Sequence, residues 1–95
     1  MKMDKRIPQW NNAVILEKKA DGTLIVYSRS SGRLFQVRGI AAQACEALDG
    51  STDIGSILSG LMEDVDPSHQ KRLSGDLMEF LEDLESRSLI TFSSS

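Results

Sequence analysis

SGRLFQVRGIA, residues 31–41, is the stretch that decides the fold of this chain. Gly32 favours a turn, the residues after it alternate as in a strand, and the apolar spacing becomes helical after Gly39. We predict that residues 34–38 are the last strand of a small sheet. One edge of such a strand has no neighbour and offers backbone N–H and C=O groups to a ligand. We therefore expect this edge to bind a partner.

Two more strands are predicted before this stretch. Residues 13–19 begin as an apolar, β-branched run, and residues 23–28 continue in the same way. Between them stands Asp21-Gly22, for which we expect a type I′ hairpin turn. The three segments predict an antiparallel meander. In its third strand, Phe35 and Val37 should face the core, because alternate side chains share one face.

Three helices are predicted after the meander. The first carries apolar residues at positions 41, 44, 45 and 48. Ser51, Thr52 and Asp53 offer a choice of N-caps for the second, and the charge of Asp53 suits its first turn. Asp66-Pro67 marks the start of the third helix, which should run to about Ser86. Residues 89–92 suggest a short terminal strand. This order predicts an α+β fold, a three-stranded antiparallel sheet followed by three helices.

Length and composition favour one small soluble domain. The chain has 95 residues with a net charge of −3, which disfavours a nucleic-acid partner, and no apolar run suits a signal peptide or membrane span. Its single cysteine cannot form an internal disulfide, so a cytoplasmic location is expected. We expect a flexible basic tail over residues 1–12, with Trp10 packing on the sheet, a domain over residues 13–92, and frayed residues 93–95.

Side chains for catalysis are scarce. His69 and Cys45 are the only histidine and cysteine, so one chain cannot assemble a usual zinc site. Cys45 lies in the apolar stripe of its helix, where a cysteine is usually an inert core residue. The glycines form neither a P-loop nor a dinucleotide fingerprint. We expect no enzyme activity, no metal and no cofactor.

Three segments carry a resemblance to a known family. They are SGRLFQV at residues 31–37, ALDGSTDI at residues 47–54, and the pattern Asp76-Leu77-x-x-Phe80-Leu81-x-x-Leu84 that closes with Leu89-Ile90. Together they resemble the PqqD-like family of leader-peptide-binding domains, called RiPP recognition elements, over residues 13–92. Two departures stand out. The family commonly has Leu-Asn where this chain has Val37-Arg38, and glycine where it has Ser88.

The resemblance implies a fold like a winged helix-turn-helix that holds a precursor leader peptide. The leader would add as an antiparallel strand between the third strand and the last helix, for presentation to a modifying enzyme, often a radical S-adenosylmethionine enzyme. Proline at Phe35 or Val37 should then weaken binding. On the last helix we expect the flank with Asp76 and Asp83 to line the groove, rather than the flank with Ser74 and Met78. For the leucines of this helix an ordinary core role is the alternative. The expected peptide-binding residues are Leu34, Phe35, Gln36, Val37, Arg38, Leu73, Asp76, Leu77, Phe80 and Asp83.

Two other functions fit the same elements. A winged-helix DNA-binding or regulatory module would place the last helix in the major groove. That helix offers Lys71 and Arg72 near its start and then mostly acids, which phosphates would repel. A homodimer that pairs the exposed strands of two copies is the other alternative. We expect neither nucleic acid nor a membrane as partner.

Overall fold

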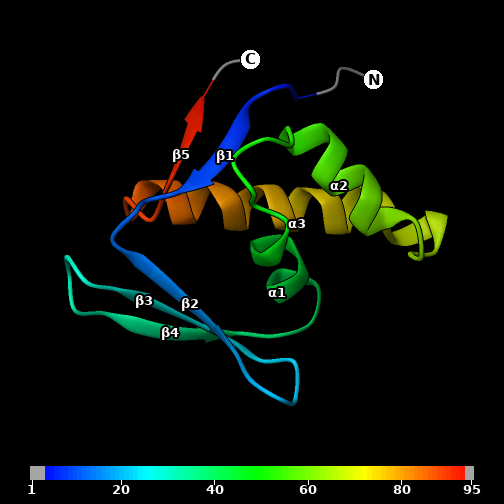
Figure 1. Cartoon of the computed structure of the whole chain (residues 1–95). Coiled ribbons are helices and arrows are strands. Elements are labelled where there is room, and N and C mark those ends of the chain that lie inside the picture. The colour runs from blue at the N-terminus through cyan, green and yellow to red at the C-terminus, as the bar shows by residue number, and fades with distance from the viewer. Residues whose placement is uncertain (1–3, 94–95) are drawn as a thin grey trace.

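The computed structural model describes residues 4–93, so residues 1–3 and 94–95 of the two predicted tails lie outside the described residues. Three of its strands form an antiparallel sheet in the order β2-β3-β4. Their bounds are Val14–Lys18 for β2, Leu24–Ser28 for β3 and Leu34–Val37 for β4. Three helices follow, α1 (Gly39–Glu46), α2 (Ile54–Met62) and α3 (Pro67–Ser86). The predicted α+β architecture is therefore confirmed (Figure 1).

The β2–β3 hairpin differs from the predicted type I′ turn. Lys19 N–H donates to the carbonyl of Thr23, and Gly22 N–H donates back to the carbonyl of Lys19, so the loop between them has three residues. Only Gly22 adopts a positive φ, of 89°, in this loop. The Asp21 side chain instead accepts a hydrogen bond from Thr23 N–H at 2.9 Å. The loop is thus a three-residue hairpin connection with glycine in the left-handed position.

Capping residues start the second and third helices where they were predicted. Asp53 Oδ1 accepts from Ser56 N–H at 2.7 Å, and Asp66 Oδ1 accepts from Ser68 N–H at 3.0 Å. Each carboxylate satisfies a backbone donor that the first turn leaves free. In contrast, Arg38 stands at the N-cap of α1 and makes no side-chain hydrogen bond to that helix.

The core lies between the inner face of the three-stranded sheet and the helices. Val26 from the central strand, Ile54 from α2 and Leu81 from α3 are all fully buried. Val37 is buried, and Phe35 packs partly buried against the same cluster, as the strand alternation predicted. Close packing of these side chains holds β4 and α3 in a fixed relative position.

A second, two-stranded sheet was not predicted. β1 (Ile7–Trp10) pairs antiparallel with β5 (Ile90–Ser93), which places Ile7 opposite Ser93. This differs from the flexible tail expected over residues 1–12 and from the frayed residue at position 93. Pro8 is fully buried, and the Arg6 guanidinium lies 4.7 Å from the centre of the Phe92 ring. In Figure 1 this pair and the three-stranded sheet lie at opposite ends of the view, with α3 between them.

Candidate functional site

One edge of the three-stranded sheet is open along β4, since β3 pairs with β4 on one side only. Backbone direction along this strand follows from the hairpin. Ser28 N–H donates to the carbonyl of Arg33 at 2.9 Å, so these two residues form a hydrogen-bonded pair. Hydrogen-bonded and non-hydrogen-bonded pairs alternate along an antiparallel ladder. The pairs Val26–Phe35 and Leu24–Val37 are therefore also hydrogen-bonded pairs.

The alternation decides which backbone groups a partner can reach. Phe35 and Val37 direct their N–H and C=O groups toward β3, whereas Leu34 and Gln36 direct theirs outward. The prediction that proline at Phe35 or Val37 removes a donor from the open edge is therefore wrong. Those donors belong to the ladder with β3. A matched disruption of the edge has to target Leu34 or Gln36.

A cleft of about 590 Å³ runs between β4 and α3. Five of the predicted peptide-binding residues line it: Leu34, Phe35, Val37, Phe80 and Asp83. Three further lining residues were not predicted: Arg33, Leu84 and Arg87. Leu34 is 57% exposed, which is unusual for a leucine and leaves apolar surface at the mouth of the cleft. The walls are thus apolar with charged residues at the rim.

The remaining predicted residues lie elsewhere. Leu77 is buried in a cluster with Ala44 and Met62, and Leu73 packs partly buried against the same cluster. Both leucines therefore contribute to packing between α3 and the other helices. Asp76 is exposed on α3, one turn before Phe80. Of the two acids on the preferred flank of α3, Asp83 lines the cleft and Asp76 does not, while Met78 on the other flank packs against the core.

Arg87 and Asp83 form an ion pair at the rim. Arg87 Nε–H donates to Asp83 Oδ2 at 2.9 Å across one turn of the helix end. Both side chains are about half exposed, so solvent weakens this pair. The spacing of four residues between acid and base is visible in the sequence and is the signal that could have indicated Arg87.

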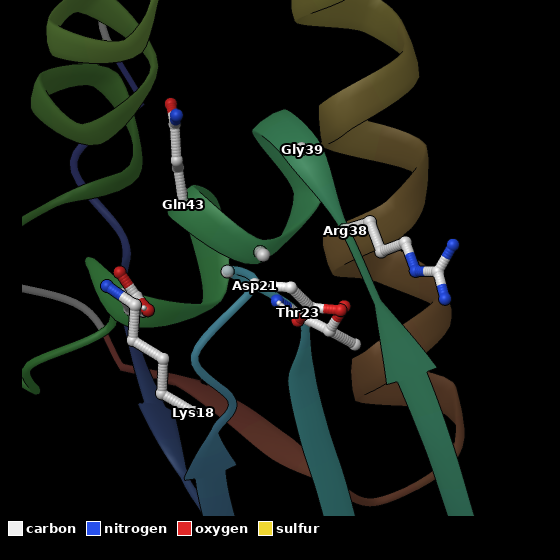
Figure 2. A pocket seen from close by; sticks show the side chains of 9 residues that line it. Lys18, Asp21, Thr23, Arg38, Gly39 and Gln43 are labelled. Atoms are coloured by element: carbon white, nitrogen blue, oxygen red, sulfur yellow. Dashed lines mark hydrogen bonds and ion pairs between the residues drawn. The ribbon is translucent and has the colours of Figure 1, made fainter.

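Gln36 and Arg38 project from the other face of β4. Arg38 lines a separate polar cavity of about 440 Å³ at the start of α1. In Figure 2 the Arg38 side chain extends away from Asp21 and Thr23, while the Lys18 side chain extends toward α1. The Lys18 ammonium pairs with Glu46 at 3.3 Å. The cavity is lined by Lys18, Asp21, Gly22, Thr23, Arg38, Gly39, Ala42, Gln43 and Glu46.

Groups suited to catalysis are not gathered at the cleft. Cys45 is buried in the core, and burial, aided by the charge of Glu46, raises the pKa of its thiol to about 12. Residues 4–93 contain no group of three or more His, Cys, Asp or Glu side chains placed to hold a metal ion. Among the described helices, none is long and apolar enough to cross a membrane. The cleft thus offers a backbone edge, apolar walls and arginines.

Comparisons with known proteins agree with this fold. Residues 22–90 match the family described as coenzyme PQQ synthesis protein D (PqqD). A solved structure described as TbiB1 in complex with the TbiA(beta) leader peptide superposes with a TM-score of 0.72. That match covers 86% of this chain and 93% of the other. Because the sequence identity is 18%, the match is evidence of a shared fold alone. A comparison with curated proteins finds no match.

Proposed function

The chain belongs to the PqqD family, and from that premise we propose that it binds the leader segment of a ribosomally made precursor peptide. The leader would add to β4 as a further antiparallel strand and fill the cleft against α3. The protein would present the bound precursor to a modifying enzyme, and a radical S-adenosylmethionine enzyme is the partner class we favour. It would catalyse no reaction itself.

The observation that carries this proposal is the coincidence of an open strand edge with a cleft. Leu34 and Gln36 offer backbone donors and acceptors that suit any peptide sequence, and this supplies affinity without selectivity. Phe35, Phe80 and Leu84 supply the apolar walls that would select side chains. TbiB1, which has a similar fold, was solved in complex with a leader peptide, and this supports a leader peptide as the ligand class.

The direct experiment is an NMR titration of the isotope-labelled chain with short peptides encoded beside its gene. A leader should shift the amide signals of Leu34 and Gln36 together with those of Phe80 and Asp83, because the proposal places it between the two segments. Shifts confined to the cavity around Arg38, or no shift with every such peptide, would refute binding along β4.

Pairing of two β4 edges in a homodimer is the competing use of the same surface. Analytical ultracentrifugation over a hundredfold range of concentration separates the two cases. A constant monomer mass, with a mass increase only when peptide is added, is the result expected for a leader-binding protein. A dimer that the peptide fails to dissociate would instead mean that the edge is already occupied.

A further inference from the structure

One end of the cleft has a chemistry of its own. A second cavity, of about 240 Å³, continues from it and shares Arg33, Phe35 and Arg87 with it. The other lining residues of the second cavity are Ser28, Ser31 and Leu89. Ser28 is 5% exposed, and its hydroxyl lies 3.2 Å from that of Ser30. The two cavities therefore meet between the arginine that precedes β4 and the arginine that ends α3.

This end is positively charged although the chain has a net charge of −3. Asp83 faces it, and that carboxylate already pairs with Arg87. Arg33 has no ion pair within residues 4–93. Glu82 and Glu85, two other acids of the helix, line neither cavity. Two guanidinium groups thus face one carboxylate here.

The register along β4 determines which peptide positions reach these groups. A strand added through Leu34 and Gln36 has its intervening side chains opposite Val37, Phe35 and Arg33, on the cleft side of the sheet. Because such a strand runs antiparallel to β4, it meets Val37 first and Arg33 last. Successive cleft-facing positions are two residues apart in the peptide.

We infer that the bound segment has the pattern apolar-x-apolar-x-acidic in the N-to-C direction. Its two apolar side chains pack between β4 and α3, and its carboxylate lies between Arg33 and Arg87. Guanidinium groups bind carboxylates through directed, charge-assisted hydrogen bonds, and the neighbouring serine hydroxyls add donors. This inference rests on the proposed strand addition and goes beyond it by stating which peptides are selected.

The test uses the full chain and fluorescein-labelled peptides with the central sequence Ile-Thr-Leu-Thr-Glu, flanked on both sides by Thr-Lys. A second peptide carries Gln in place of Glu, and a third carries the central sequence reversed. Fluorescence anisotropy should show about fivefold tighter binding of the Glu peptide than of the Gln peptide, the ratio expected from a partly exposed ion pair. The reversed peptide should bind more weakly than the first.

Two variants of equal charge assign the preference to a residue. In Arg33→Gln most of the preference for the Glu peptide should be lost, because the remaining Arg87 already pairs with Asp83. Arg29→Gln should keep the preference. Arg29 is a fair control because it is exposed and donates to the carbonyl of Asn12, outside both cavities. A peptide with Lys in place of Glu should bind better to Arg33→Glu than to the wild type. Circular dichroism spectra serve as the check that each variant is folded.

The outcomes separate this inference from the proposed function. If the Glu and Gln peptides bind the wild type equally while shifting the Leu34 and Gln36 amides, the acidic preference is overturned and strand addition stands. If Arg29→Gln abolishes the preference as fully as Arg33→Gln, its assignment to Arg33 is overturned. Tighter binding of the reversed peptide overturns the antiparallel order. If no peptide of the set shifts the β4 amides, strand addition fails and the inference fails with it.

Discussion

Trp10 of β1 donates the hydrogen of its indole Nε1 to the backbone carbonyl of Cys45 at 3.2 Å, across 35 residues of sequence. The bond ties the unpredicted first strand to the last turn of α1, and the partly buried indole packs against the main core. The N-terminal strand therefore contributes to the stability of the domain.

Trp10→Phe should lower the free energy of unfolding by about 1 kcal/mol, because it keeps an aromatic ring and removes one hydrogen bond. Trp10→Ala should cost about 3 kcal/mol, since it also removes the packed ring. Urea denaturation followed by circular dichroism measures both values. Equal stability of all three proteins would mean that β1 is dispensable to the fold.

Gln36→Pro should weaken binding of the Ile-Thr-Leu-Thr-Glu peptide about tenfold, because it removes a donor from the open edge of β4. Proline is tolerated at an edge strand when its nitrogen faces solvent, so the variant should stay folded. Gln36→Ala keeps the donor and should bind as the wild type does. In contrast, Val37→Pro should destabilise the sheet, because that donor pairs with β3. Fluorescence anisotropy and thermal unfolding separate the two effects.

Ser88→Gly should stabilise the protein by about 0.5–1 kcal/mol. Ser88 adopts a φ of 62° immediately after α3, a region that costs residues other than glycine free energy. Leu89 N–H donates to the carbonyl of Leu84 at 3.0 Å, which identifies the helix end as a Schellman motif with Ser88 at its glycine-preferring position. Thermal unfolding measures the gain. The control Ser86→Gly changes the last residue of α3 and should instead lower the melting temperature.

Cys45 should resist alkylation by iodoacetamide at pH 8 in the folded protein and react at once in urea. Burial raises the pKa of its thiol from 9.0 to about 12, so folding favours the neutral form. The stability from this group is complete below about pH 9 and is lost as the pH rises toward 12. In urea titrations, Cys45→Ala should lose less free energy of unfolding between pH 9 and pH 12 than the wild type does. Rapid alkylation of the native protein would contradict the buried position.

The elements with local signals could be predicted from the sequence. Asp53 and Asp66, both among the expected N-caps, cap the second and third helices. The β2–β3–β4 meander has the predicted antiparallel order, and Phe35 and Val37 face the core as the alternation in the third strand predicted. β1 could not be predicted in this way, because its partner strand lies at the other end of the chain. The basic residues that precede β1 and the proline within it indicate a tail when they are considered without that partner.

The candidate site could be predicted only in part. The resemblance to the PqqD-like family indicated Phe35 and Phe80, which both line the cleft. The direction of each backbone N–H on β4 required the register, which depends on the length of the hairpin loop. Leu77 lies in a cluster between helices. The helix α3 is long enough to contact the core under the three-stranded sheet at one part and α1 at another. Periodicity alone does not distinguish these two contacts.

The pairing of Ile7 with Ser93 brings the two ends of the described chain to one place, and Figure 1 shows β1 and β5 at the side remote from β4. Such a domain can be inserted into a surface loop of a larger host protein with little disturbance, because the host chain enters and leaves at adjacent points. A circular permutant, with the ends joined by a short linker and the chain reopened in the loop at Asp21 and Gly22, should keep the same fold.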